Sequence, residues 1–289
     1  MPKLSLHASQ LSLSTGSLAR VAGGNPDLLI ERLGQVEPPG VEVLLFGRWS
    51  DDIDGSADKA RAADLRVWTV HGEKRIGGKF GRPDRAEQAE GQRLFVDAVR
   101  FCERVGCPYL STHLWDLPDS DADLARNLAA LAEVHDEARR RGVTVLIEVI
   151  PTRHHEPLEN MARVVDALGD EALFTIDFEF LSWNRPIEEQ LPAIVDAFGE
   201  RIVNLHIRDY DGKPFSDEGK RRYVRPGAGR IAFERVFDLL HQKARPRIYT
   251  LEGSYDAAGD WAGQVADDLA RVAGWMAGAH QAGKAEQGA

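Results

Sequence analysis

Four residues of metal-binding type end four successive apolar segments in the second half of the chain. Glu148 follows VTVLI, Asp177 follows LFTI, His206 follows IVNL and Glu252 follows IYTL. Each segment is short and rich in β-branched residues, which is typical of a strand buried on both faces. Three carboxylates and one imidazole converge on one point only if these strands lie side by side. Such a set suits a hard or borderline divalent cation, namely Mn, Mg, Co or Zn.

The elements that must position these residues alternate between strand-like and helix-like segments along the whole chain, which indicates a parallel sheet covered by helices. The predicted strands are residues 3–8, 41–46, 65–70, 108–112, 143–149, 173–177, 202–207 and 248–252. Eight strands favour a closed (β/α)8 TIM barrel over an open doubly wound sheet. We expect a single domain over residues 1–279 and a small, polar, flexible tail over residues 280–289.

The intervening helices are predicted from amphipathic spacing and from their ends. Two of them carry an apolar stripe with steps of three and four residues. The stripes are Leu124, Leu128, Leu131 and Val134 in one helix, and Val265, Leu269, Val272 and Met276 in the other. Asn25-Pro26-Asp27 is typical of a helix start, and Arg141-Gly142 is typical of a helix end.

In a (β/α)8 barrel the chemistry lies at the C-terminal ends of the strands. Other polar or aromatic residues therefore belong to the same face as the four metal-binding types. These are His7, His71, His113, Arg208, Asp209, Trp49, Trp115 and Trp183.

Each of these residues has a functional and a structural interpretation. His71 and His113 are candidates for substrate hydrogen bonds, for a second metal or for a purely structural role. Strand alternation points Arg208 to the same side as His206, where it either holds a substrate oxygen or pairs with an acid in the loop. Trp115 and Trp183 either stack on a substrate ring or pack between loop and barrel.

Composition bounds the class of protein. The chain has 289 residues, 43% of them hydrophobic, which is enough for one large core. Its formal net charge of −10 argues against generic nucleic-acid binding, because nucleic-acid-binding proteins usually show a basic surface.

Cys102 and Cys107 lack a C-x-x-C spacing and are predicted to be reduced thiols. No apolar run reaches membrane-spanning length, and we expect a cytoplasmic protein.

Two glycine-containing segments, residues 71–85 and 211–230, break the acidic pattern after the third and seventh predicted strands. Their basic residues are Lys74, Arg75, Lys79, Arg82, Arg85, Lys213, Lys220, Arg221, Arg222, Arg225 and Arg230. Such charge at the catalytic face either favours an anionic substrate or is simply solvated. Long loops of this composition also suit a mobile lid.

The chain resembles the xylose isomerase-like barrel superfamily, which includes sugar isomerases, sugar epimerases and endonuclease IV. The resemblance covers essentially the whole chain. It rests on IEV (147–149), TID (175–177), LHIRD (205–209), RPGAGRIAF (225–233) and TLEGS (250–254). It implies that Glu148, Asp177, His206 and Glu252 bind one divalent metal, and that the two glutamates act as acid and base. Homo-oligomers are common among such barrels.

The sequence departs from the family pattern at two positions. Phe180 stands where many members have a histidine, three positions after the aspartate of the sixth strand. Ala228 stands where the Pro-Gly-x-Gly segment usually carries a charged residue. Both departures bear on substrate and reaction and leave the four ligands intact.

The resulting hypothesis is an isomerase or epimerase of a sugar, sugar acid or sugar phosphate. Such an enzyme removes a proton beside a carbonyl and returns it, while a metal stabilises the enediolate charge. Glu148 and Glu252 are the expected proton carriers as well as ligands. His71, His113, Arg208, Trp115 and Trp183 are the expected substrate-binding residues.

Three alternatives stay open at this point. A dehydratase of a cyclic polyol uses the same site. An endonuclease IV-like DNA phosphoesterase fits His71, His113 and the four ligands, but Phe180 replaces an expected zinc ligand and the segment 211–230 contains no histidine. A barrel that binds a sugar or a partner without turnover is the third.

Overall fold

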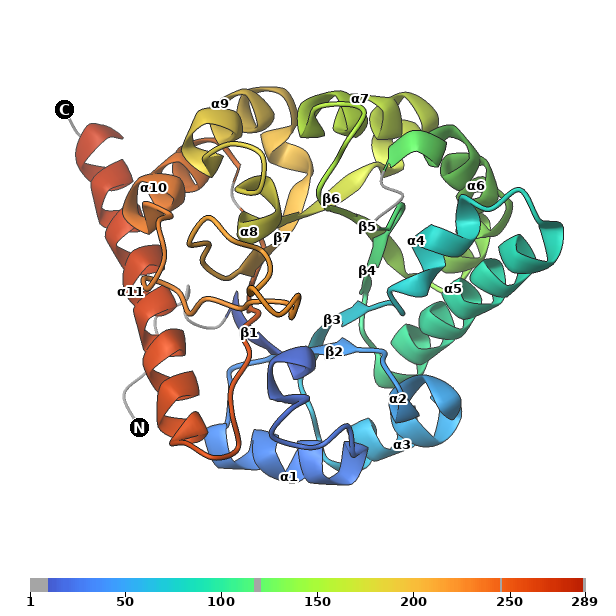
Figure 1. Ribbon diagram of the computed structural model, residues 1–289, viewed down its shortest axis with the longest axis horizontal. Helices are drawn as coiled ribbons and strands as arrows, with labels where there is room; N and C mark the ends of the chain where they lie inside the picture. Colours follow the sequence, from blue (N-terminus) through green and yellow to red (C-terminus); the bar gives the residue numbers. More distant parts are fainter. Residues whose placement is uncertain (1–9, 117–120, 245, 288–289) are drawn as a thin grey trace. The chain divides into compact units, whose positions relative to one another are not determined.

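The structure is a computed structural model that describes residues 10–116, 121–244 and 246–287, with side chains up to residue 279. Its eight strands form a closed barrel in the order β1 to β8 (Figure 1). The strands are β1 Leu11–Ser14, β2 Val41–Leu44, β3 Val67–His71, β4 Tyr109–His113, β5 Thr144–Val149, β6 Leu173–Asp177, β7 Ile202–Ile207 and β8 Ile248–Leu251. The barrel is parallel at β1–β8, β3–β4, β4–β5 and β7–β8. The predicted (β/α)8 architecture is confirmed.

Seven of the predicted strands lie where the sequence placed them, and the first does not. The predicted strand at residues 3–8 lies outside the described residues, as does His7. The strand that pairs with β8 is Leu11–Ser14, with Leu11 opposite Tyr249 and Leu13 opposite Leu251. Its sequence, LSLS, alternates leucine with serine, yet all four residues are buried. Without a continuous apolar run, the segment resembles a loop in sequence.

Helices separate the strands along the chain. They are α1 Pro26–Val36, α2 Arg48–Asp51, α3 Ile53–Ala62, α4 Arg75–Phe80, α5 Arg85–Val105, α6 Leu124–Arg140, α7 Pro157–Leu168, α8 Phe178–Leu181, α9 Ile187–Phe198, α10 Phe233–Lys243 and α11 Trp261–Gln287. Short 3-10 turns cover Thr15–Leu18, Asp121–Asp123, Gly169–Glu171 and Gly199–Arg201. Among the described residues, no helix combines enough length with enough apolar character to cross a membrane.

The predicted helix ends are confirmed. Asn25 caps α1 by accepting hydrogen bonds from the backbone N–H groups of Asp27 and Leu28, at 2.9 and 3.4 Å. Pro26 occupies the first helical position, where a missing N–H costs nothing. Helix α6 ends at Arg140, and Gly142 then adopts a φ of 69°, which glycine reaches without strain.

The two predicted apolar stripes differ in outcome. In α11 all four stripe residues are buried. In α6 only Leu124 and Leu131 are buried, whereas Leu128 and Val134 are half-buried. The buried face of α6 instead includes Asn127, whose amide donates to the carbonyl of Gly77 at 3.0 Å. Apolar spacing alone misses a buried polar residue of this kind.

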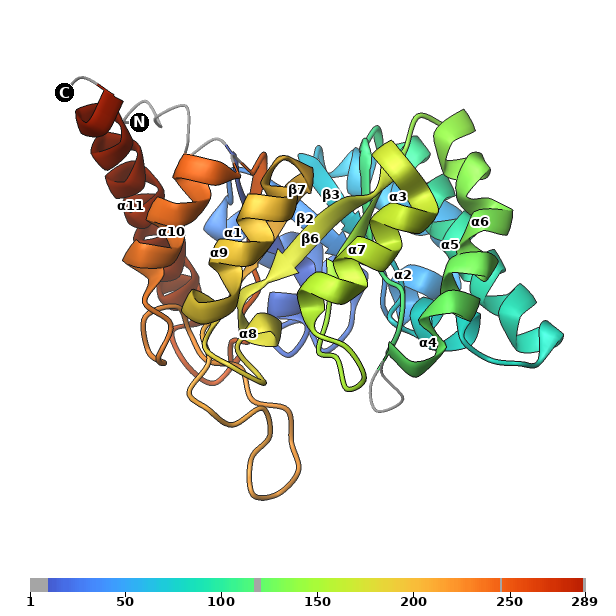
Figure 2. The same ribbon diagram turned by 90° about the horizontal axis from the view of Figure 1, so that it is seen from above.

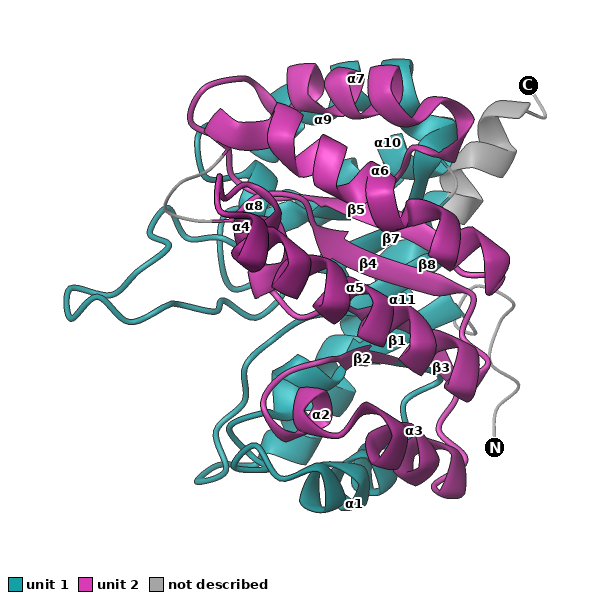
Figure 3. Ribbon diagram, turned by 90° about the vertical axis from the view of Figure 1, so that its right-hand side faces the viewer, with its two compact units in different colours: residues 1–41, 176–289 teal, residues 42–175 magenta. Residues whose placement is uncertain are grey.

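The chain divides into two compact units, coloured separately in Figure 3. Unit 1 comprises residues 1–41 and 176–289, and unit 2 comprises residues 42–175. The single domain expected over residues 1–279 stays a prediction. Helix α11 runs to Gln287, into the segment predicted as a tail, and residues 288–289 lie outside the described residues. The flexibility of that tail also stays a prediction.

The segment 71–85, predicted as a glycine-rich loop, contains helix α4 in unit 2. A Cβ atom on Gly77 would lie 2.7 Å from the carbonyl oxygen of Trp115, so only glycine lets α4 approach the chain after β4 this closely. Ile76 and Phe80 are fully buried on the same helix. The glycines therefore serve close packing at this position, which the sequence does not distinguish from loop flexibility.

The segment between β7 and α10 is a long loop within unit 1. Figure 2 shows it in orange, extending away from α9 and α10. Its base is closed by Asp209, whose carboxylate accepts hydrogen bonds from the N–H groups of Gly227, Gly229 and Ile231 at 2.9, 2.8 and 3.1 Å. The same carboxylate accepts from Tyr210 at 2.7 Å. Four backbone donors on one carboxylate fix where the loop leaves and rejoins the barrel.

Candidate functional site

The predicted site residues stand on a layer of buried, hydrogen-bonded polar side chains. Because side chains alternate along a strand, a residue two positions earlier shares the same face. In unit 1, Thr250 donates to Asn204 at 2.9 Å. In unit 2, Ser111 donates to Thr175 at 2.9 Å and Thr69 donates to Glu42 at 3.0 Å. All these side chains are buried.

Each strand from β3 to β8 has a predicted site residue at or next to its C-terminal end. In all of them except β5, one of these polar residues lies two positions before that site residue. The pairs are Thr69 and His71, Ser111 and His113, Thr175 and Asp177, Asn204 and His206, and Thr250 and Glu252. Satisfied hydrogen bonds beneath a site restrict the side chains above it. Within each unit, these hydrogen-bonded pairs therefore restrict the site residues above them.

In unit 1, three of the four predicted metal ligands lie close together. His206 Nδ1 is 3.7 Å from Glu252 Oε2 and 4.0 Å from Asp177 Oδ2. Asp177 and His206 are fully buried, and Glu252 is 6% exposed. These residues come from β6, β7 and the end of β8, as the sequence predicted. Together with Glu179 and Arg208 they form what we call the carboxylate cluster.

Arg208 lies inside this cluster and is 2% exposed. Its Nη2 atom is 2.6 Å from Asp177 Oδ2, and its Nη1 atom is 3.2 Å from Glu252 Oε2. The guanidinium carbon lies 4.5 Å from the ring centroid of Phe180, at cation–π distance. Alternation along β7 thus directs Arg208 to the His206 side, as predicted. Its partners are the carboxylates of the cluster rather than Asp209, which closes the loop base.

Glu179 belongs to the cluster and was missed by the sequence analysis. It lies in α8 and is 2% exposed. One carboxylate oxygen is 2.8 Å from Arg208 Nε, and the other is 2.5 Å from Arg221 Nη1. The available signal was an acid inside the apolar stretch FEFL, because a buried carboxylate needs a charged partner.

Asp177 has a second, local role. Its Oδ1 atom accepts a hydrogen bond from the backbone N–H of Phe180 at 2.8 Å and thereby caps α8. An acid at a strand end is often a helix cap, and here one carboxylate serves both the cap and the cluster. The cap holds Oδ1, so the orientation of Oδ2 toward His206 is set by the backbone.

In unit 2, His71, His113 and Glu148 form a second group, which we call the histidine cluster. Glu148 Oε2 lies 2.7 Å from His71 Nε2 and 2.8 Å from His113 Nε2. The two imidazole rings meet edge to face at 5.2 Å between centroids. Burial lowers the pKa of His113, against the opposing effect of the Glu148 carboxylate. Neutral imidazole is the form that binds metals.

The hydrogen bonds of His71 bear on whether a cation fits this cluster. His71 Nδ1 lies 2.7 Å from the carbonyl oxygen of Gly72, which only accepts, so Nδ1 carries hydrogen. In neutral His71 the Nε2 atom then presents a lone pair to Glu148 Oε2. Two lone pairs at 2.7 Å repel each other, so a proton or a cation must lie between them. One ligand atom from each of the three residues lies within 4.8 Å of the others, which fits a metal ion.

The two tryptophans predicted to bind substrate differ in their surroundings. Trp115 is 1% exposed, and its indole N–H donates to the carbonyl of Pro151 at 3.1 Å, which favours the packing interpretation. Trp183 is half-buried, and its indole donates to Glu179 at 3.3 Å. Its ring contacts Phe180 and Phe215 at 5.7 and 5.9 Å. Trp183 therefore belongs to the surroundings of the carboxylate cluster, and Trp115 belongs to the core of unit 2.

Much of the positive charge in the two basic segments is paired. In unit 1, Arg221 contacts Glu179, Arg222 contacts Asp211, and Arg225 contacts Asp268 at 2.8 Å. In unit 2, Arg75 pairs with Glu73, and Lys79 pairs with Glu90 at 2.6 Å. Arg221 also lies among four aromatic rings. These are Phe180, Trp183, Phe215 and Tyr223. The segments therefore offer less free positive charge than their sequence indicates.

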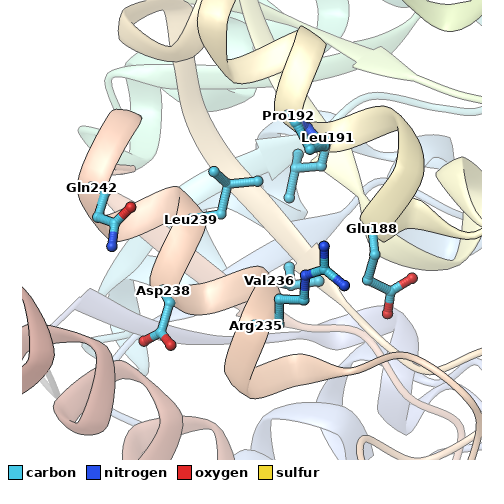
Figure 4. Close-up of a pocket in the computed structure, with 8 residues that line it drawn as sticks. All are labelled: Glu188, Leu191, Pro192, Arg235, Val236, Asp238, Leu239 and Gln242. Atoms are coloured by element: carbon cyan, nitrogen blue, oxygen red, sulfur yellow. The ribbon is translucent and has the colours of Figure 1, made fainter.

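Two hollows open in unit 1 apart from the clusters. One, of about 270 Å³, lies beside Trp183, between the turn after α8 and Tyr210, Arg230 and Ile231. The other, of about 230 Å³, lies between α9 and α10 (Figure 4). Figure 4 shows Leu191 and Leu239 on its walls and Arg235 and Glu188 at one end. Neither hollow is lined by a residue of the carboxylate cluster.

Cys102 and Cys107 are free, as predicted, and both are buried.

Relatives with a similar sequence include a sugar-phosphate epimerase. The L-ribulose-5-phosphate 3-epimerase of Escherichia coli O1:K1 is 27% identical over 198 residues. The match covers 65% of this chain and 64% of that protein, and the same protein of Escherichia coli O45:K1 matches equally. The chain thus spans less than two thirds of the length of these relatives.

Solved structures share the fold at low sequence identity. An L-ribulose 3-epimerase is 18% identical with a TM-score of 0.71, covering 95% of this chain and 96% of that one. The 3-keto-D-glucoside 4-epimerase of E. coli is 17% identical with a TM-score of 0.66, over 91% and 98% of the two chains. The D-allulose 3-epimerase of Methylomonas sp. is 18% identical with a TM-score of 0.64, over 91% and 94%. The model of one protein family, described as a xylose isomerase-like TIM barrel, matches residues 36–276. The chain belongs to the xylose isomerase-like TIM-barrel family.

Proposed function

We propose that the protein is a divalent-metal-dependent isomerase or epimerase of a sugar, sugar acid or sugar phosphate. The observation that carries the proposal is the carboxylate cluster. Three buried residues of metal-binding type, Asp177, His206 and Glu252, converge there from three consecutive strands. Four relatives named above are epimerases of sugars or sugar phosphates, which supports the same reaction class.

The proposed ligands are Glu148, Asp177, His206 and Glu252. Oxygen and nitrogen donors of this kind accept Mn, Mg, Co or Zn. When bound, the cation supplies positive charge that stabilises negative charge developing on substrate oxygens. Glu148 and Glu252 stand at the ends of β5 and β8, three strands apart in the barrel order. We assign them removal and return of the proton on the carbon beside the substrate carbonyl.

Arg208 and Trp183 are assigned to the substrate side of this proposal. Arg208 presents a fixed positive charge within the carboxylate cluster, which suits a substrate oxygen. Trp183 offers a half-buried indole face, which suits the apolar face of a sugar ring. Because most basic groups near them are paired, a neutral sugar fits as well as a phosphorylated one. The reaction on a polyol, loss of water, would use the same proton carriers.

The first test is elemental analysis of the chain purified without chelator or added metal. We expect about one Mn, Co, Mg or Zn per chain and loss of that metal in Asp177→Ala. Incubation of a panel of ketoses, aldoses and their phosphates in D2O should then incorporate solvent deuterium beside the carbonyl of the true substrate. An isomer, an epimer and a dehydrated product are told apart by NMR of the same samples. A chain that binds no metal after reloading contradicts the proposal.

Phosphoester hydrolysis is a second candidate, which the histidine cluster favours. His71, His113 and Glu148 would hold a further metal, as multi-metal phosphoesterases require. Against it stand Phe180, which offers no ligand, and the Arg208 guanidinium stacked on that ring. Two or three zinc ions per chain, with cleavage of DNA that contains abasic sites, would favour this candidate. One metal per chain without such cleavage favours the isomerase.

A further inference from the structure

Glu179 is an acidic residue of the carboxylate cluster that the proposed metal ligation does not use. It is 2% exposed, and both of its oxygens face guanidinium groups. Arg208 Nε lies 2.8 Å from one oxygen, and Arg221 Nη1 lies 2.5 Å from the other. A buried carboxylate needs such partners, because burial of an unpaired charge is costly. The placement of Glu179 is therefore tied to that of Arg208.

Arg208 contacts both Glu179 and two of the proposed ligands. The same guanidinium contacts Asp177 at 2.6 Å and Glu252 at 3.2 Å. A guanidinium and a divalent cation compete for these carboxylates, because both are positive charges that need the same oxygen lone pairs. When a cation takes Asp177 and Glu252, Glu179 is the carboxylate of the three that keeps Arg208 paired.

We propose that Glu179 is a positioning residue for the metal site, which retains the Arg208 guanidinium while a divalent cation takes Asp177 and Glu252. This inference rests on the proposed metal-dependent function. Without the Glu179 charge, Arg208 pairs more closely with Asp177 and Glu252 and opposes metal binding. Removal of Arg208 has the opposite effect, because it frees both carboxylates for the cation.

The proposed role predicts that two substitutions change the affinity for Mn²⁺ in opposite directions. The measurement is the dissociation constant for Mn²⁺, by isothermal titration calorimetry on the full chain after removal of bound metal. Glu179→Gln should weaken binding by about 10- to 100-fold, as is typical for residues that orient metal ligands. Arg208→Gln should strengthen it. In the Arg208→Gln background, adding Glu179→Gln should cost no more than about threefold, because the coupled partner is gone.

Asp268→Asn is the matched control. Asp268 is 1% exposed, lies in the same unit and pairs with Arg225 at 2.8 Å. Like Glu179, Asp268 is buried and paired with an arginine. Among the described residues, however, it has no contact with Arg208. Its substitution should leave the Mn²⁺ dissociation constant within about twofold of the wild type, since it removes charge only outside the cluster.

The outcomes separate this inference from the proposed function. A wild-type chain that binds neither Mn²⁺ nor Zn²⁺ overturns both. Metal binding by the wild type with equal losses from Glu179→Gln in both backgrounds, or with weaker binding in Arg208→Gln, overturns the positioning role alone. Circular dichroism and thermal melting check folding. If Glu179→Gln does not fold, Arg208→Gln is compared with the double variant, where similar affinities support the role and a further tenfold loss contradicts it.

Discussion

Single residues in the carboxylate cluster carry charges that depend on one another. Asp177, Glu179, His206 and Arg208 are each 2% exposed or less, so water screens their interactions weakly. Removal of one member leaves its partner charged and buried, which is more costly than removal of the pair. Substitutions that keep the size and lose the charge are therefore the informative ones at this scale.

Glu252→Gln and Glu148→Gln test the proton carriers. Each should lower turnover by about 10²- to 10⁴-fold, because the amide neither takes nor returns a proton. Circular dichroism and metal content should be measured on the same samples, since both residues are also proposed ligands. Near-normal turnover in both variants would exclude the proposed role. A control is Glu234→Gln, since Glu234 is exposed in α10, outside the cluster.

At the scale of an element, the loop between β7 and α10 depends on the space around Gly229. A Cβ atom there would lie 2.6 Å from the carboxyl carbon of Asp209 and 2.6 Å from the carbonyl oxygen of Tyr210. The neighbours are backbone and a carboxylate held by four N–H groups, so neither yields easily. The second glycine of the Pro-Gly-x-Gly segment is thus explained by close packing on Asp209, and the first, Gly227, by its φ of 81°.

Gly229→Ala should lower the free energy of unfolding by about 1–3 kcal/mol, the usual cost of forcing an atom into a packed site. Urea denaturation followed by circular dichroism measures the change. If the loop also orders the substrate side of the site, the Michaelis constant should rise in the same variant. An unchanged unfolding midpoint would show that the loop base tolerates the extra methyl group.

Gly274→Ala, in α11, should change the free energy of unfolding in the opposite direction. Apart from the backbone of the helix itself, no atom of the described residues lies within 4 Å of the Cβ position, and the backbone is helical. Alanine should raise the free energy of unfolding by about 0.5–1 kcal/mol, because glycine loses more backbone entropy in a helix. The urea midpoint should therefore increase for Gly274→Ala and decrease for Gly229→Ala. A decrease in both would contradict the packing argument.

For the whole molecule, buried tyrosines are expected to contribute to the loss of stability at alkaline pH. Burial raises the pKa of Tyr249 to about 12. Burial also raises the pKa of Tyr255, with a further contribution from Asp268, to which its hydroxyl donates at 2.9 Å. In the unfolded chain tyrosine ionises near pH 10. The folded pKa is the higher one, so the stabilisation is complete below pH 10 and is lost as the pH rises toward 12.

The free energy of unfolding should therefore fall between pH 10 and pH 12. Tyr249 alone contributes on the order of 2 kcal/mol to this fall, because folding raises its pKa from 10.0 to about 12. Urea denaturation of wild type and Tyr249→Phe at pH 9 and pH 11.5 isolates the contribution. The fall should be smaller in Tyr249→Phe, because phenylalanine does not ionise. Equal falls in both chains would show that Tyr249 ionises without cost in the folded state.

Much of the fold follows from local pattern. Strands β2 to β8 are predicted because runs such as VTVLI and IVNL are continuous and apolar, the form that a strand buried on both faces requires. Strand β1 is missed because LSLS carries serines whose burial depends on neighbouring strands. Helix α4 is missed because its glycines indicate a loop until the contact with Trp115 is known.

By itself, the sequence determined the barrel and the residue types at the strand ends, because hydrophobic periodicity and chain order are local properties. Only the tertiary structure decided the partners of those residues. It placed Arg208 among carboxylates, gave Glu179 its two guanidinium partners and buried Trp115. Such pairings join residues that are far apart in sequence, and their energy depends on distance and burial. Neither quantity is contained in residue order alone.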